Sequence, residues 1–209
     1  LRVARCAAMR GLDVALIEQA DFASGTSGRS SRMLHGGIRY LAQGHIEQVR
    51  HASKEKVIVS RIAPHLSSPL PFIFPTYRGT AWPKWKLAIG VKLYDLLCSG
   101  RNLGPSKILS AAQTLAMLRE LDPVNLTGAV RYFDGATNDA RLVLDTIRSA
   151  DLHGASVFNY TRLMNTRFES GKWICEMIHQ DSGKESVVRA PCVVNATGPW
   201  SDQVKHSRM

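Results

Sequence analysis

The stretch "LRVARCAAMRGLDVALIEQADF", residues 1–22, has the order of a helix, a glycine, a short apolar strand and an acid. Gly11 suits the position after a helix, where a left-handed backbone is needed. Residues 14–17 are apolar, which is typical of a strand buried on both faces. Glu18 follows them, and an acid at such a strand end binds the ribose hydroxyls in dinucleotide-binding units. The stretch predicts part of a Rossmann-like α/β unit, although a βα repeat of another kind has the same order.

The glycine fingerprint GxGxxG of a dinucleotide-binding unit precedes this acid by about twenty residues. Counting back from Glu18 by that length passes Leu1. We therefore expect the first strand and the phosphate-binding loop of such a unit to lie before Leu1. Without that strand, residues 14–17 would form an open sheet edge that favours aggregation.

The composition fits a soluble globular protein, because 44% of the 209 residues are hydrophobic and 21% are charged. The four cysteines are scattered, without CxxC or another metal-ligand spacing, so we expect reduced thiols in a cytosolic chain and no metal site. The net charge of +10 favours an anionic partner such as a phosphorylated ligand or a lipid surface. Nucleic acid is not expected, because the basic residues are spread out and form no recognised nucleic-acid motif.

Residues 26–41, "TSGRSSRMLHGGIRYL", combine glycines with many hydrogen-bond donors. Glycine lets the backbone approach a ligand, hydroxyls can donate to phosphate oxygens, and arginine pairs with anions. Each residue alone also has a simpler explanation, such as a helix-terminal histidine or a surface ion pair. Together, and next to Glu18, they predict a cofactor pocket. We expect a helix from His35 or Gly36 to about Leu41, and a second helix over residues 45–62.

Five motifs resemble FAD-dependent glycerol-3-phosphate dehydrogenases and occur in the order of that family. They are "DFASGTSGRSSRMLHGGIRYL", "APHLSSPLPFIFP", "GVKLYDLL", "YFDGATNDARLVL" and "VVNATGPWSD". The resemblance runs from about residue 1 to about residue 202. Arg32 and Arg29 depart from it, because the family often has lysine and a small residue there.

The resemblance implies an α/β fold with an α+β second domain. Residues 1–62 and 137–209 would be parts of an incomplete Rossmann-like FAD-binding domain, and residues 63–136 part of a discontinuous substrate (cap) domain. Arg39 and Tyr40 match substrate-binding positions. No catalytic residue is expected in this chain, because the family's catalytic histidine lies further downstream. The matched FAD-binding positions are Glu18, Thr26, Ser27, Ser30, Ser31, Arg32, His35, Gly36, Ala196 and Gly198.

The resemblance implies oxidation of sn-glycerol 3-phosphate to dihydroxyacetone phosphate, with electrons passing through FAD to a quinone. It implies a cytoplasmic enzyme bound peripherally to the inner membrane, which is the mitochondrial inner membrane in a eukaryote. A homodimer is left open. We expect an intact protein to be longer at both ends, and the 209 residues alone to be inactive. The alternatives are an oxidase of the same fold that uses oxygen, and a truncated, non-catalytic remnant that binds a membrane or other proteins.

Further elements follow from local patterns. Four prolines in residues 64–75 exclude a helix there and limit strand pairing to sheet edges or short pieces, and residues 72–74 can form a brief strand. Residues 82–101 predict a basic amphipathic helix, which either lies on a membrane surface or packs on the second domain. We also expect strands at residues 130–133, 156–161 and 192–195, a helix from Asn138 or Asp139 to Gly154, and a β-hairpin beginning at Trp173.

Overall fold

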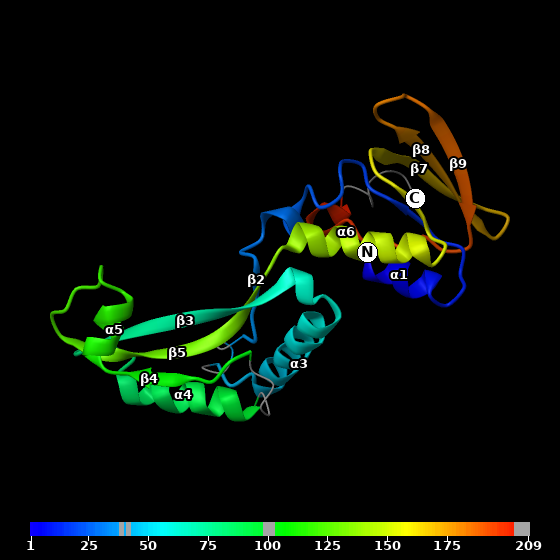
Figure 1. Ribbon diagram of the computed structural model, residues 1–209. Helices are drawn as coiled ribbons and strands as arrows, with labels where there is room; N and C mark the ends of the chain where they lie inside the picture. The colour runs from blue at the N-terminus through cyan, green and yellow to red at the C-terminus, as the bar shows by residue number, and fades with distance from the viewer. Residues whose placement is uncertain (38–39, 41–42, 98–102, 203–209) are drawn as a thin grey trace. The chain divides into compact units, whose positions relative to one another are not determined.

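The computed structural model describes residues 1–37, 40, 43–97 and 103–202. The chain divides into two compact units (Figure 1). Unit 1 contains residues 1–29 and the chain from Asp139 onward, and unit 2 contains Ser30–Asn138. The chain passes from unit 1 to unit 2 after residue 29 and returns to unit 1 after Asn138. The domain boundaries at residues 62 and 63 and at residues 136 and 137 stay a prediction.

Unit 1 holds the parallel strand pair that the opening stretch predicts. Strand β1 (Ala15–Ile17) pairs in parallel with β6 (Ser156–Phe158), with Ala15 opposite Ser156. Helix α1 (Arg2–Ala8) packs beside α6 (Asp139–Leu152), through a small core of Ala8, Ala150 and Ala155 with Val14 against it. Parallel pairing with helical crossovers is the arrangement of α/β proteins, so the predicted fold class is confirmed.

Glycines end both helices of unit 1 as the sequence predicts. Gly11 has φ +75°, and its N–H donates to the carbonyl of Ala8 at 2.8 Å. Gly154 has φ +90°, and its N–H donates to the carbonyl of Asp151 at 2.8 Å. Both bonds use carbonyl groups that have no partner inside the helix, so the left-handed residue terminates it.

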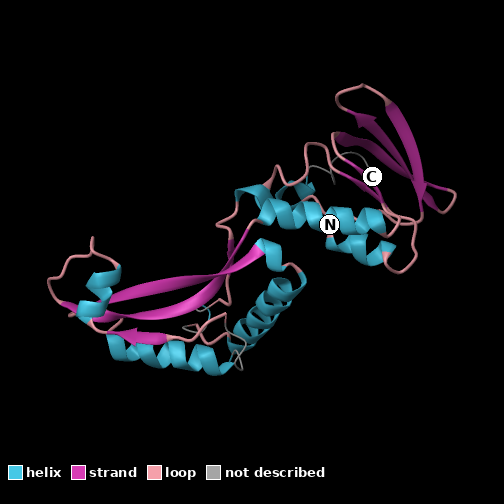
Figure 2. Cartoon of the chain, in the orientation of Figure 1, coloured by secondary structure: helices cyan, strands magenta, loops and turns pink. Residues whose placement is uncertain are grey.

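An antiparallel sheet of three strands, β7 (Thr161–Glu169), β8 (Lys172–His179) and β9 (Glu185–Ala190), follows in unit 1 (Figure 2). The β8–β9 hairpin is the one predicted from Trp173 onward. The strand expected at residues 156–161 is interrupted, because Tyr160 has φ +47° and its N–H donates to the carbonyl of Ala20. The buried strand expected at residues 192–195 is wrong: among the described residues no strand pairs with it, and Val194 is 59% exposed.

Unit 2 is built on the long strand β5 (Leu126–Thr137). Strand β3 (Ser67–Tyr77) pairs with one edge of β5, and the short strands β2 (Met33–Leu34) and β4 (Lys107–Leu109) pair with the other, all antiparallel. The strand expected at residues 72–74 is therefore much longer. Prolines 69, 71 and 75 are tolerated because, among the described strands, β3 is an edge strand that pairs with β5 alone.

Helices α3 (Ile46–Ile62) and α4 (Lys84–Leu97) pack against this sheet, and η2 (Pro64–Leu66) and α5 (Ala111–Met117) complete the unit. Val49 of α3 and Tyr94 of α4 are fully buried, and Val130 of β5 is 1% exposed. The helix expected to begin at His35 or Gly36 does not begin there, because residues 35–37 have no regular structure after β2. Gly36 and Gly37 are instead buried in unit 2, whereas His35 is exposed.

Candidate functional site

Glu18 stands at the carboxyl end of β1, where the sequence places it. Its backbone N–H donates to the carbonyl of Phe158 at 2.8 Å, which continues the parallel pairing by one residue. The side chain is half-buried, and its Oε1 accepts a hydrogen bond from the N–H of Ala20 at 3.0 Å. Within the described chain the other oxygen, Oε2, accepts no hydrogen bond. The carboxylate is thus oriented by its own turn and retains an acceptor for a ligand hydroxyl.

The next candidates, Thr26 and Ser27, lie in the short 3-10 helix η1 (Thr26–Arg29) with both side chains exposed. Glycine is needed on this helix because a Cβ atom at Gly28 would lie 2.2 Å from the carbonyl oxygen of Ala23. Ala23 itself has φ +63°. The loop before η1 is therefore folded tightly on itself, which presents the two hydroxyls to solvent.

Residues from the other end of unit 1 pack beside η1. The ring of Trp200, in the 3-10 helix η3 (Gly198–Trp200), approaches Gly25 so closely that a Cβ there would lie 3.2 Å from its Cζ3 atom. Asn195 shapes the turn before η3, because its Oδ1 accepts hydrogen bonds from the N–H and hydroxyl of Thr197. Ala196 and Gly198 are exposed on this turn, and Gly198 has φ +60°. The fold thus brings the "NATGPW" motif against the loop before Thr26.

The remaining candidates belong to unit 2. Ser30, Ser31 and Arg32 are exposed, and the Ser30 hydroxyl accepts a hydrogen bond from the N–H of Arg32 at 3.1 Å. Arg32 has φ +56°, and its carbonyl accepts from the N–H of Thr137 at 2.9 Å. Ser30–Arg32 therefore forms a turn that β5 fixes at its end, with the Arg32 side chain in solvent.

His35, Gly36 and Tyr40 follow β2. His35 is exposed, whereas Gly36 is buried and its N–H donates to the Oδ1 of Asp134 at 3.0 Å. Tyr40 is 42% exposed, and its N–H donates to the carbonyl of Gly37 at 2.8 Å. Arg39, the other residue expected to bind substrate, lies outside the described residues.

The structure thus groups the candidates in two sets. Glu18, η1 and the turn at residues 196–198 share unit 1, and residues 30–36 with Tyr40 share unit 2. Four residues next to these sets were not among the predicted site residues. Trp200 packs against Gly25 beside the first set. Lys56, Tyr94 and Asp134 surround Gly36 in the second set. Tyr94 and Asp134 lie in the quoted motifs "GVKLYDLL" and "YFDGATNDARLVL", which is the signal that could have found them.

The resolved pKa shifts lie away from both sets. Burial raises the pKa of the Cys175 thiol on β8. A hydrogen bond from Arg167 lowers the pKa of the neighbouring Glu176, with a smaller contribution from Asn165. Both groups belong to the β7–β8 pair. The Cys175 shift follows from burial in the sheet, and the Glu176 shift from hydrogen bonds with its neighbours on β7.

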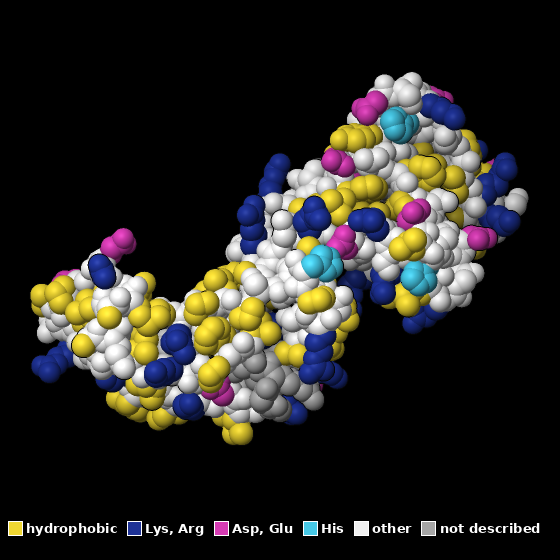
Figure 3. All heavy atoms as spheres, viewed as in Figure 1, with side chains coloured by type: hydrophobic (Ala, Val, Ile, Leu, Met, Phe, Trp, Pro, Cys, Tyr) yellow, Lys and Arg dark blue, Asp and Glu magenta, His cyan; other side chains and the backbone are white. Residues whose placement is uncertain are grey.

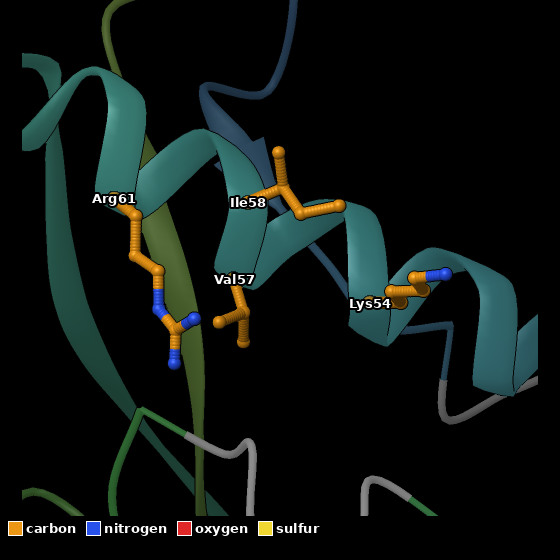
Figure 4. Close-up of a pocket in the computed structure, with 4 residues that line it drawn as sticks. All are labelled: Lys54, Val57, Ile58 and Arg61. Carbon is orange, nitrogen blue, oxygen red and sulfur yellow. The ribbon is translucent and has the colours of Figure 1, made fainter.

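A shallow hollow on the outer side of α3 also lies apart from the candidates. Lys54, Val57, Ile58 and Arg61 line it (Figure 4). All four project from successive turns of one helix, and three of them are exposed.

Within the described residues, no group of three or more histidine, cysteine, aspartate or glutamate side chains is placed to hold a metal ion.

The residues of unit 1 fit the nucleotide end of FAD. A carboxylate at the end of a parallel strand is the acceptor that a ribose hydroxyl needs, and Oε2 of Glu18 is available for it. The exposed hydroxyls of Thr26 and Ser27 can donate to phosphate oxygens. The Gly198 backbone carries no side chain that would block a ring edge.

A comparison with protein families matches residues 1–209 to the family described as FAD dependent oxidoreductase. The alpha-glycerophosphate oxidase of Streptococcus pyogenes serotype M18 is 36% identical over 97% of this chain and 34% of its own. The mitochondrial glycerol-3-phosphate dehydrogenase of Bos taurus is 40% identical over 95% of this chain and 29% of its own. The chain thus spans about a third of the length of these relatives.

Solved structures agree on the fold. The glycerol-3-phosphate dehydrogenase from Bacillus halodurans, complexed with FAD, superposes with a TM-score of 0.73 and 28% identity. The match covers 98% of this chain and 33% of that one. The L-proline dehydrogenase from P. horikoshii, at 18% identity and a TM-score of 0.67, shares the fold alone.

Proposed function

Since the chain belongs to the FAD dependent oxidoreductase family, we propose that it is part of an enzyme that oxidises sn-glycerol 3-phosphate to dihydroxyacetone phosphate. One observation supports the choice of substrate. Relatives named as an oxidase and as dehydrogenases, 35–40% identical over 95–97% of this chain, all have glycerol phosphate in their names. The five motifs quoted above fall within the matched region.

The reaction removes two electrons and two protons from a secondary alcohol. FAD, when bound, supplies the acceptor for the electrons. This chain would hold the adenosine ribose with Glu18 and the pyrophosphate and flavin with the other candidates from Thr26 to Gly36 and at Ala196 and Gly198. Arg39 and Tyr40 would bind the substrate, for which a guanidinium and a phosphate are well matched. The base that takes the hydroxyl proton would come from outside these residues.

We propose a quinone as the electron acceptor, and oxygen as the alternative, because relatives named as dehydrogenases and as oxidases both match the chain. The protein expressed from its complete reading frame and loaded with FAD is expected to reduce a soluble quinone analogue when glycerol 3-phosphate is added without oxygen. In air it is expected to release little hydrogen peroxide. Release of one hydrogen peroxide per substrate oxidised would mean that oxygen, not a quinone, is the electron acceptor. If neither acceptor is reduced, the result would favour a non-catalytic remnant.

The outer face of α4 supports the proposal of a peripheral membrane enzyme. A membrane crossing needs a long, uniformly apolar helix, and the described residues contain none. One face of α4 is buried in unit 2 through Val91 and Tyr94. The opposite face exposes Trp85, Ile89, Leu93 and Leu96, at 40% or more each. The buried face fits packing on the second domain, and the exposed face supports the proposed contact with a membrane surface.

Basic side chains accompany the exposed face of α4. Hydrophobic and basic side chains lie together over this region in Figure 3. Lys86 and Lys92 are exposed, and the Lys86 ammonium lies 5.7 Å from the centre of the Trp85 ring. Lys84, the first residue of α4, donates to the carbonyl of Thr127 at 2.7 Å and is half-buried. Tryptophan with exposed lysines fits the interface of an anionic bilayer, which we propose is the inner membrane seen from the cytoplasm or, in a eukaryote, the mitochondrial inner membrane.

Replacing Lys86 and Lys92 together by alanine is expected to weaken binding to vesicles that contain phosphatidylserine by about thirtyfold. Each lysine near an anionic surface contributes about 1 kcal/mol. Co-sedimentation at low salt measures the effect. The matched control removes the same charge from Lys54 and Arg61 on α3 and is expected to leave binding within about twofold. Equal losses in the two variants would contradict a docking face on α4.

A further inference from the structure

Three segments of unit 2 converge on one oxygen atom beneath the expected substrate-binding segment. The Oδ1 of Asp134, on β5, accepts hydrogen bonds from Lys56 Nζ of α3 at 2.8 Å and from the hydroxyl of Tyr94 of α4 at 3.1 Å. Its third donor is the backbone N–H of Gly36, at 3.0 Å. Lys56 Nζ also donates to the Tyr94 hydroxyl at 3.2 Å. The Lys56 and Asp134 side chains are 1% and 4% exposed, so the ion pair is shielded from water.

The backbone comes unusually close to this ion pair at Gly36. A Cβ atom there would lie 1.8 Å from the Tyr94 hydroxyl oxygen and 2.8 Å from the Ser53 hydroxyl oxygen. A residue with a Cβ atom could occupy that position only if the buried Tyr94 and Ser53 side chains shifted. The position of Gly36 is therefore set by buried side chains rather than by its own loop.

The constraint reaches Tyr40 through Gly37. A Cβ atom at Gly37 would lie 2.6 Å from Cδ2 of the Tyr40 ring, and Gly37 has φ +75°. The N–H of Tyr40 donates to the Gly37 carbonyl at 2.8 Å. The Tyr40 carbonyl then accepts from the N–H of His45 at 2.9 Å, just before α3. Gly37 and Tyr40 are thus tied, through His45, to the start of the helix that carries Lys56.

A buried ion pair is a poor way to gain stability, because desolvation offsets much of the attraction. The ion pair instead fixes the orientation of the groups that bond to it. A charged oxygen with three donors from different elements fixes their relative positions more strictly than apolar packing does. A group placed about 1 Å wrongly can cost two orders of magnitude in rate.

We propose that Lys56, Asp134 and Tyr94 are positioning residues, which fix Gly36 and so hold Tyr40 in the geometry that binds substrate. None of the three needs to touch the substrate. The link to Tyr40 as a substrate ligand rests on the proposed function. The link to the position of Gly36 rests on the contacts above.

The test is Asp134→Asn in the full-length protein, which keeps the side-chain size and removes its charge. KM for glycerol 3-phosphate is expected to rise at least about tenfold, with activity normalised to the FAD content read at 450 nm. Amide hydrogen exchange at Gly36, Gly37 and Tyr40, without substrate, is expected to accelerate. Lys56→Arg, which keeps the positive charge, is expected to stay close to the parent protein in both measurements.

Thr76→Val is the matched control. The Thr76 hydroxyl is a buried group of the same sheet that bonds the Thr127 hydroxyl at 2.7 Å and the Gly128 carbonyl at 3.0 Å, away from Gly36. This variant is expected to lose stability without a change in KM or in exchange at Gly36. Equal behaviour of Asp134→Asn and Thr76→Val would overturn the proposal.

The test still gives an answer if the variant does not fold or if the parent protein lacks the proposed activity. If Asp134→Asn does not fold, the neutral pair Lys56→Gln with Asp134→Asn takes its place under the same criteria. If the parent protein does not oxidise glycerol 3-phosphate, the proposed function fails. The exchange comparison still decides whether the buried ion pair positions Gly36 and Tyr40, because it needs no substrate.

Discussion

Replacing Asp134 by alanine is expected to lower the free energy of unfolding by about 3–5 kcal/mol. The variant leaves the Lys56 ammonium buried at 1% exposure without its counter-charge, and removes the acceptor of the Gly36 N–H and the Tyr94 hydroxyl. An uncompensated buried charge is among the most destabilising changes known for a single residue. Urea denaturation of the purified protein measures the loss.

Two variants separate the lost ion pair from a general effect of removing a carboxylate. The double variant Lys56→Met with Asp134→Leu removes both charges and is expected to recover much of the stability, because the apolar side chains can pack where the ions lay. Asp181→Ala removes an exposed carboxylate in the turn after β8 and is expected to change the free energy by less than about 0.5 kcal/mol. A loss below about 1 kcal/mol for Asp134→Ala would mean that Lys56 reaches water in solution.

Arg39→Ala is expected to reduce kcat/KM for glycerol 3-phosphate by about 10- to 150-fold. The range corresponds to the 1.5–3 kcal/mol that hydrogen bonds to a charged group contribute. Arg39 lies outside the described residues, so the prediction rests on the family resemblance and on the match between guanidinium and phosphate. Steady-state kinetics of the full-length, FAD-loaded protein give the result.

Arg39→Lys is expected to fall between the parent protein and Arg39→Ala, because lysine keeps the charge without the planar pair of donors. Arg61→Ala removes an exposed arginine of the α3 hollow and is expected to leave kcat/KM within about twofold. FAD content should be equal in all of these proteins. Unchanged kinetics in Arg39→Ala would remove this residue from the substrate site.

Local signals predicted those parts of the fold whose hydrogen bonds close within a few residues. Gly11 and Gly154 end helices by bonding carbonyls three residues earlier, and Glu18 follows the strand that the apolar run at residues 14–17 predicts. Local patterns predicted strands wrongly, because a segment forms a strand only where another strand pairs with it. Residues 192–195 are apolar enough for a strand, but no described strand pairs with them. Conversely, proline-rich residues 67–77 form a long strand because β5 pairs with them over their whole length.

For the site, the sequence by itself determined which residue types are present and, through the motif resemblance, which cofactor and substrate class they suit. The tertiary structure decided which buried side chains contact and position these residues. Gly36 meets Asp134 across a separation of 98 residues, Asp134 meets Lys56 across 78, and Tyr94 meets Asp134 across 40. No periodicity or motif spacing encodes such a meeting. It arises because α3, α4 and β5 pack together, and buried polar groups must find their partners there rather than in water.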